Sequence, residues 1–133
     1  MLKLEHIGIA VKDLANAELL FSKLLNCKSY KQEEVASENV MTSFFKSGDS
    51  KIELLMSNNE NSAIAKFIEK RGEGIHHLAF EVENIENEII RLKNEGFQFI
   101  NDVPKLGADN KRICFLHPKA TNGVLIELCE ELK

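Results

Sequence analysis

Two histidines and two glutamates occupy matching places in this sequence. His6 and His77 each lie near the start of a stretch that alternates as a β-strand does, and Glu53 and Glu127 each lie inside a later one. Strand alternation places all four on the face opposite the main apolar stripe. Two imidazoles and two carboxylates are a good ligand set for a divalent ion, and without a cysteine they favour borderline or hard ions. The sequence therefore predicts a metal site.

Taken singly, each of these residues has an ordinary explanation. A glutamate between aliphatic residues is usually the solvent-facing member of a half-exposed strand, and a strand histidine is more often structural than ligating. The metal-site hypothesis rests on the repeat, because chance does not readily place a histidine and a glutamate at the same two positions in both halves. We expect the other histidines to serve differently, with His76 in the core and His117 in a surface turn.

The sequence pattern indicates an internal repeat, with two copies of one structural module. His6–Leu14 matches His77–Ile85 in residue character, and Ile52–Leu55 matches Ile126–Cys129. Each copy predicts a strand, a helix and three more strands. We therefore expect an α+β fold in which two pseudo-symmetric βαβββ modules form one cupped mixed sheet, with the four polar side chains facing inward and the helices outside.

The expected organisation is a single domain, 1–133, with modules at about 1–58 and 73–133 and a connecting helix at about 62–71. In the first module, Asp13 is the predicted N-cap of a helix that ends at Asn26; in the second, Asn84 caps a helix that ends at Gly96. The predicted strands are Leu4–Val11, Lys31–Val35, Val40–Phe45, Lys51–Met56, His76–Val82, Gln98–Asn101, Arg112–Leu116 and Gly123–Cys129.

Composition narrows the class of protein. With 44% hydrophobic and 29% charged residues in 133, the chain is an ordinary globular one rather than a disordered one. Its net charge of −4 and scattered basic residues argue against nucleic acid as a partner. It has neither an apolar run long enough for a membrane span nor a signal-peptide pattern. Three cysteines without a Cys-x-x-Cys pair suit a reducing cytoplasm, so we expect a soluble cytoplasmic protein.

The chain resembles the glyoxalase, or vicinal oxygen chelate, superfamily over nearly its whole length. The stretches that carry the resemblance are Leu4–Val11, Ile64–Val82, Lys111–Lys119 and Gly123–Cys129. The first is shared across the superfamily. The others are closer to the branch that epimerises methylmalonyl-CoA than to the lactoylglutathione lyase branch.

The resemblance implies a homodimer, an acyl-CoA substrate and one divalent ion per chain, commonly cobalt, zinc, manganese or nickel. The family's ligands fall on His6, Glu53, His77 and Glu127. The implied reaction is metal-dependent epimerisation of (R)- and (S)-methylmalonyl-CoA, by abstraction of the C2 proton through a metal-stabilised enolate. Glu127 is the first choice for the base, with Glu53 as its counterpart. Some epimerases carry a further acid where Thr42 is the nearest match here.

Two alternatives remain open at this point. Lactoylglutathione lyase uses the same four ligands to isomerise a hemithioacetal by a similar proton transfer. A non-catalytic member of the superfamily would bind a small molecule in the cupped cavity without a metal. The intact His and Glu set favours an enzyme over this second alternative.

Overall fold

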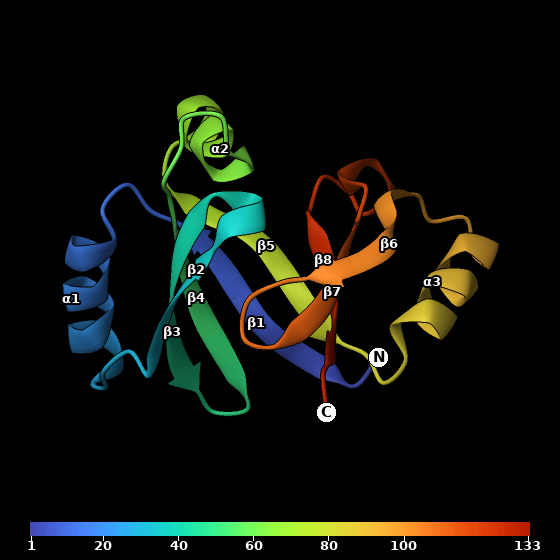
Figure 1. The fold of residues 1–133 in the computed structure, drawn as a ribbon, viewed down its shortest axis with the longest axis horizontal. Coiled ribbons are helices and arrows are strands. Elements are labelled where there is room, and N and C mark those ends of the chain that lie inside the picture. Colours follow the sequence, from blue (N-terminus) through green and yellow to red (C-terminus); the bar gives the residue numbers. More distant parts are fainter. The chain divides into compact units, whose positions relative to one another are not determined.

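The computed structural model describes residues 1–133, and its contacts divide the chain into two compact units. One unit is His6–His76, and the other combines Met1–Glu5 with His77–Lys133. The helices and strands of each are labelled in Figure 1. No helix has the length and apolar character needed to cross a membrane.

The first unit holds the elements of the first predicted module, from His6 of its first strand onward, and the predicted connecting helix. Their order is β1 (Lys3–Ala10), α1 (Leu14–Leu25), β2 (Lys31–Val35), the short 3-10 helix η1 (Ala36–Glu38), β3 (Val40–Ser47), β4 (Ser50–Ser57) and α2 (Ala63–Arg71). Strand β1 pairs in parallel with β4, while β3 runs antiparallel between β4 and β2. The strand order is therefore β1-β4-β3-β2.

Helices cover both faces of these strands. Asp13 caps α1 by accepting a hydrogen bond from the Asn16 N–H at 3.1 Å, and Asn26 ends the helix in the left-handed conformation. One face packs against α1 through the core residues Val11, Leu14, Phe45 and Leu54. The other face packs at one end against α2 through Ala10, Val40, Leu55 and Ile64. Alternation along β4 thus sends neighbouring residues into different environments.

The second unit repeats this plan. Its elements are β5 (Gly74–Glu81), α3 (Ile85–Asn94), β6 (Phe99–Leu106), β7 (Lys111–Leu116), the 3-10 helix η2 (Pro118–Ala120) and β8 (Ile126–Glu131). Strand β5 pairs in parallel with β8, and β7 runs antiparallel between β8 and β6. Asn84 caps α3, whose buried side chains Ile85, Ile89 and Leu92 pack with Leu116 and Leu128.

These observations confirm the predicted α+β class and the two βαβββ modules. Two strand boundaries differ from the prediction by more than two residues. Strand β6 continues to Leu106 instead of ending at Asn101, with register shifts against β7 that accommodate the irregular stretch. Strand β8 begins at Ile126 and not at Gly123, because the Val124 N–H closes a turn onto the Thr121 carbonyl at 3.1 Å. Neither difference moves a predicted site residue off its strand.

Candidate functional site

His6 and Glu53 form a buried pair in the first unit. They lie on the parallel strands β1 and β4, where Glu53 is opposite Gly8, two residues beyond His6. His6 Nε2 is 3.4 Å from Glu53 Oε1, and the two residues are only 6% and 4% exposed. The predicted face is therefore correct for both residues.

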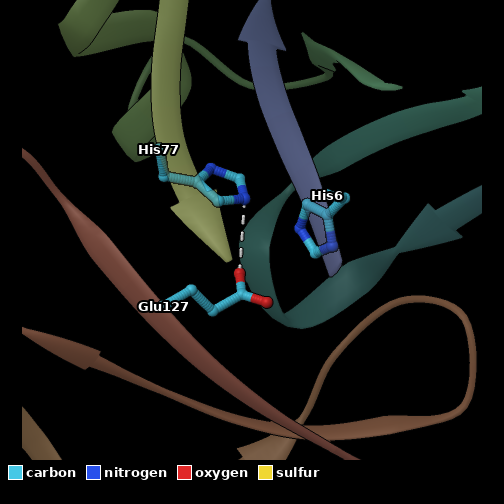
Figure 2. A group of neighbouring side chains, drawn as sticks. All are labelled: His6, His77 and Glu127. Atoms are coloured by element: carbon cyan, nitrogen blue, oxygen red, sulfur yellow. Dashed lines mark ion pairs between the residues drawn. The ribbon is translucent and has the colours of Figure 1, made fainter. Parts of the chain in front are cut away.

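His77 and Glu127 form the corresponding pair in the second unit. They lie on the parallel strands β5 and β8, with Glu127 opposite Ala79, again two residues beyond the histidine. His77 Nε2 is 3.4 Å from Glu127 Oε1, and the residues are 3% and 5% exposed. Figure 2 shows the carboxylate of Glu127 facing the His77 ring.

The two pairs have equivalent neighbours as well as the same internal geometry. The residue opposite each glutamate on the parallel strand is small, Gly8 or Ala79, so the carboxylate reaches the diagonal histidine without a bulky side chain between them. On the antiparallel strand, each glutamate is opposite a phenylalanine: Phe44 for Glu53 and Phe115 for Glu127.

These two phenylalanines were not predicted from the sequence as part of the site. Phe44 is buried, and the Phe115 ring meets His77 edge-on with centroids 5.8 Å apart. The signal that could have found them is register, because each lies one strand before its glutamate in the repeated module. The aromatic rings give both pairs an apolar wall, which lowers the local dielectric and strengthens charge interactions.

The two thiols near the second pair are buried. Burial, with a further contribution from the Glu127 charge, raises the pKa of Cys114 to about 12 and raises that of Cys129 further. Cys129 packs against Ala79, Ile113 and Phe115.

Other polar residues noted in the sequence have structural partners. The Arg112 guanidinium donates to Glu86 and Glu130, joining β7 to α3 and β8. His117 caps η2, where its Nδ1 accepts from the Lys119 N–H. His76 meets the Phe67 ring edge-on, and desolvation lowers its pKa to about 4 although the Glu38 charge opposes the shift. The Thr42 hydroxyl donates to the backbone carbonyl of Glu33 at 3.0 Å.

Comparison with known proteins places this chain in a defined family. Residues 5–115 match the model of the Glyoxalase/Bleomycin resistance protein/Dioxygenase superfamily, and the chain belongs to this superfamily. The predicted resemblance is thereby confirmed at the level of the family.

Within the superfamily the chain is similar to methylmalonyl-CoA epimerases. It is 39% identical to the ethylmalonyl-CoA/methylmalonyl-CoA epimerase of Cereibacter sphaeroides, covering 95% of this chain and 96% of that protein. The methylmalonyl-CoA epimerase structure from Mycobacterium tuberculosis matches with a TM-score of 0.93 and 34% identity, over 98% of this chain and 88% of that one.

A third structure, a methylmalonyl-CoA epimerase in complex with methylmalonyl-CoA and NH4+, matches with a TM-score of 0.92 and 30% identity, over 98% of this chain and 95% of that one. These relatives confirm the predicted epimerase-like class of isomerase.

Proposed function

We propose that this protein interconverts (R)- and (S)-methylmalonyl-CoA, with residues 1–133 acting as a single vicinal oxygen chelate domain. The observation that carries the proposal is the repeated buried His–Glu pair, with the same register and the same 3.4 Å contact in both modules. The epimerases among its relatives supply the substrate class, because one is named for ethylmalonyl-CoA and methylmalonyl-CoA and the structure of another is a complex with methylmalonyl-CoA.

We further propose that His6, Glu53, His77 and Glu127 together hold one divalent ion. His6, His77 and Glu127 are buried and each offers a nitrogen or oxygen atom that can bind a metal. The chemistry of the donor set fits cobalt, zinc, manganese or nickel, since imidazole and carboxylate suit these ions. When bound, the ion would stabilise negative charge that develops on the substrate's oxygen atoms, which is worth several kcal/mol.

In this proposal the carboxylates of Glu127 and Glu53 transfer the proton. The C2 hydrogen of methylmalonyl-CoA lies between a thioester and a carboxylate, so its loss leaves an electron pair that delocalises onto the thioester oxygen. Glu127 is the proposed base that takes this proton. Glu53, at the equivalent position in the first module, is its proposed counterpart. When a proton returns to C2 from the opposite face, the other epimer forms.

The proposal also covers the ligand, the oligomeric state and the cellular compartment of the protein. An acyl-CoA ligand is supported by the complex of a relative with methylmalonyl-CoA. Exposed leucines on α1, namely Leu19, Leu20 and Leu24, are consistent with a homodimer. Cys27, Cys114 and Cys129 are all free, which fits the cytoplasm.

A direct test gives purified protein one pure epimer and follows the formation of the other. We expect turnover that falls when chelator removes the metal and returns when cobalt is added back. Under the same conditions, the hemithioacetal of glutathione and methylglyoxal should react far more slowly. Preference for the hemithioacetal would support a lactoylglutathione lyase. Failure to turn over either substrate, with no metal bound after reconstitution, would support a binding protein.

A further inference from the structure

Three lysines share the sheet face of Glu53 in the first unit. In the register of its strands, Phe44 on β3 lies opposite both Glu53 on β4 and Lys31 on β2. Lys46 and Lys51 are each two residues from this row, and they lie opposite one another on β3 and β4. Because side chains two residues apart alternate onto the same face, all three lysines are on the side of Glu53.

The opposed pair of Lys46 and Lys51 indicates an anionic ligand. Like charges directly opposite each other on antiparallel strands repel, and this repulsion weakens the pairing of the strands. An anion bound between the two ammonium groups would replace the repulsion with two attractions. Lys46 is exposed and Lys51 is half-buried, so a ligand can approach both side chains.

Aromatic packing fixes the position of one of these cations. Lys46 Nζ lies 5.4 Å from the centroid of the Tyr30 ring, which makes a cation–π contact. The Tyr30 ring in turn packs against Phe44, with the two centroids 5.9 Å apart, and Phe44 lies opposite Glu53. A lysine held in this way loses less side-chain entropy when it binds an anion than a freely moving one does.

The second module has no lysine at the corresponding positions. Counted from Glu127 and from Phe115 opposite it, these positions hold Leu125 and His117. His117 caps η2, where its Nδ1 accepts a hydrogen bond from the backbone. The lysine pair is therefore a feature of the first module alone, and the βαβββ plan does not require it.

From these observations we infer that Lys46 and Lys51 bind the phosphate groups in the coenzyme A part of the substrate. The inference rests on the proposed function and adds a subsite for the part of the substrate that does not react. Ammonium groups bind phosphate oxygens through charge-assisted hydrogen bonds.

The positions of the two lysines suit the long arm of coenzyme A. One strand and two residues separate Lys46 from Glu53, or about 8 Å between their Cα atoms at ideal spacing. Lys46 also lies at the end of β3, beside the turn into β4. An arm that leaves the acyl group near Glu53 and follows these strands therefore passes Lys51 first and Lys46 second. The phosphates of coenzyme A lie on such an arm, beyond the thioester and the pantetheine.

The test compares methylmalonyl-CoA with methylmalonyl-pantetheine, which has the same reacting groups and no phosphate. Lys46→Met removes the charge and keeps an aliphatic side chain, and the loss of one like charge should not destabilise the fold. The matched control is Lys23→Met, because Lys23 is an exposed lysine of α1, the helix that covers the opposite face of the sheet. For each variant kcat, KM and metal content are measured with both thioesters.

We expect Lys46→Met to raise KM for methylmalonyl-CoA at least about 10-fold, the loss expected when a hydrogen bond to a charged group is removed. KM for the pantetheine thioester, kcat for both substrates and the metal content should stay as in wild type. Lys51→Met should show the same selective effect. Lys23→Met should behave as wild type with both substrates.

The inference fails in any of three cases. One is a KM for methylmalonyl-CoA within about twofold of wild type when both lysines are replaced, which is less than one such hydrogen bond contributes. Another is an equal rise in KM for both thioesters, which would place the lysines at the acyl carboxylate. A third is a fall in kcat together with loss of bound metal, which would show a role in building the metal site. Wild-type protein that turns over neither thioester would instead refute the proposed function itself.

Discussion

Substitution of Leu54 and Leu128 tests whether β4 and β8 each pack one face into a hydrophobic core and present the other face to the site. Each directly follows a site glutamate, each is 0% exposed, and each points into a helix-covered core rather than toward the His–Glu pair. We expect Leu54→Ala and Leu128→Ala to lower the free energy of unfolding strongly while leaving the chemistry of the folded protein intact.

The magnitude follows from the burial of the leucines. Removing the three outer carbons of a fully buried leucine loses about 2.4 kcal/mol of transfer free energy, and the cavity left behind raises the cost to about 3 to 4 kcal/mol. For a chain of 133 residues the unfolding entropy is about 280 cal/mol/K, so this cost lowers Tm by about 12 °C.

The assay combines thermal and urea unfolding with the epimerase rate measured well below the transition. Leu106→Ala is the matched control, because Leu106 lies on β6 but is 66% exposed, and it should shift Tm little. A cost below about 1 kcal/mol for either buried leucine would be too small for a filled core site. Loss of activity in fully folded variants would show that the two faces of β4 and β8 are not independent.

Further predictions address the metal, the thiols and the pH dependence of stability. His6→Ala and His77→Ala should each lose bound metal in elemental analysis of reconstituted protein, whereas His117→Ala, at the η2 cap, should keep it. A thiol reagent should label Cys27 alone in the native protein, because the other two cysteines are buried and their pKa values are raised; rapid labelling of three thiols would contradict this burial. Since burial lowers the pKa of His76 from 6.5 to about 4, the native state binds fewer protons there than the unfolded state. Stability from this group is present above pH 6.5 and is lost as pH falls toward 4, by about 3 kcal/mol in all. His76→Gln should flatten that part of the stability profile in urea titrations, and an unchanged profile would refute the assignment.

Much of the site was predictable from sequence because strand alternation has a period of two. Once Glu53 and Glu127 are placed inside strands, their face is fixed, and the internal repeat identifies their partners His6 and His77. The structure places each histidine beside the glutamate of its own half.

The parts that could not be predicted depend on which strands are neighbours and in what register. The roles of Gly8 and Ala79 beside the glutamates appear only when β1 is paired with β4 and β5 with β8. The end of β6 was missed because its register against β7 shifts, and the sequence pattern does not record such irregularities.

The central claim is that Glu127 removes the C2 proton of methylmalonyl-CoA. The most direct measurement follows deuterium incorporation at C2 in deuterium oxide, by NMR or mass spectrometry, for wild-type protein and for Glu127→Gln with equal metal content. We predict that wild-type protein labels C2 as it epimerises, and that Glu127→Gln loses at least about 100-fold of the labelling rate from the epimer whose proton Glu127 takes. Unchanged labelling by metal-loaded Glu127→Gln, or epimerisation by wild-type protein without any uptake of deuterium, would contradict the account.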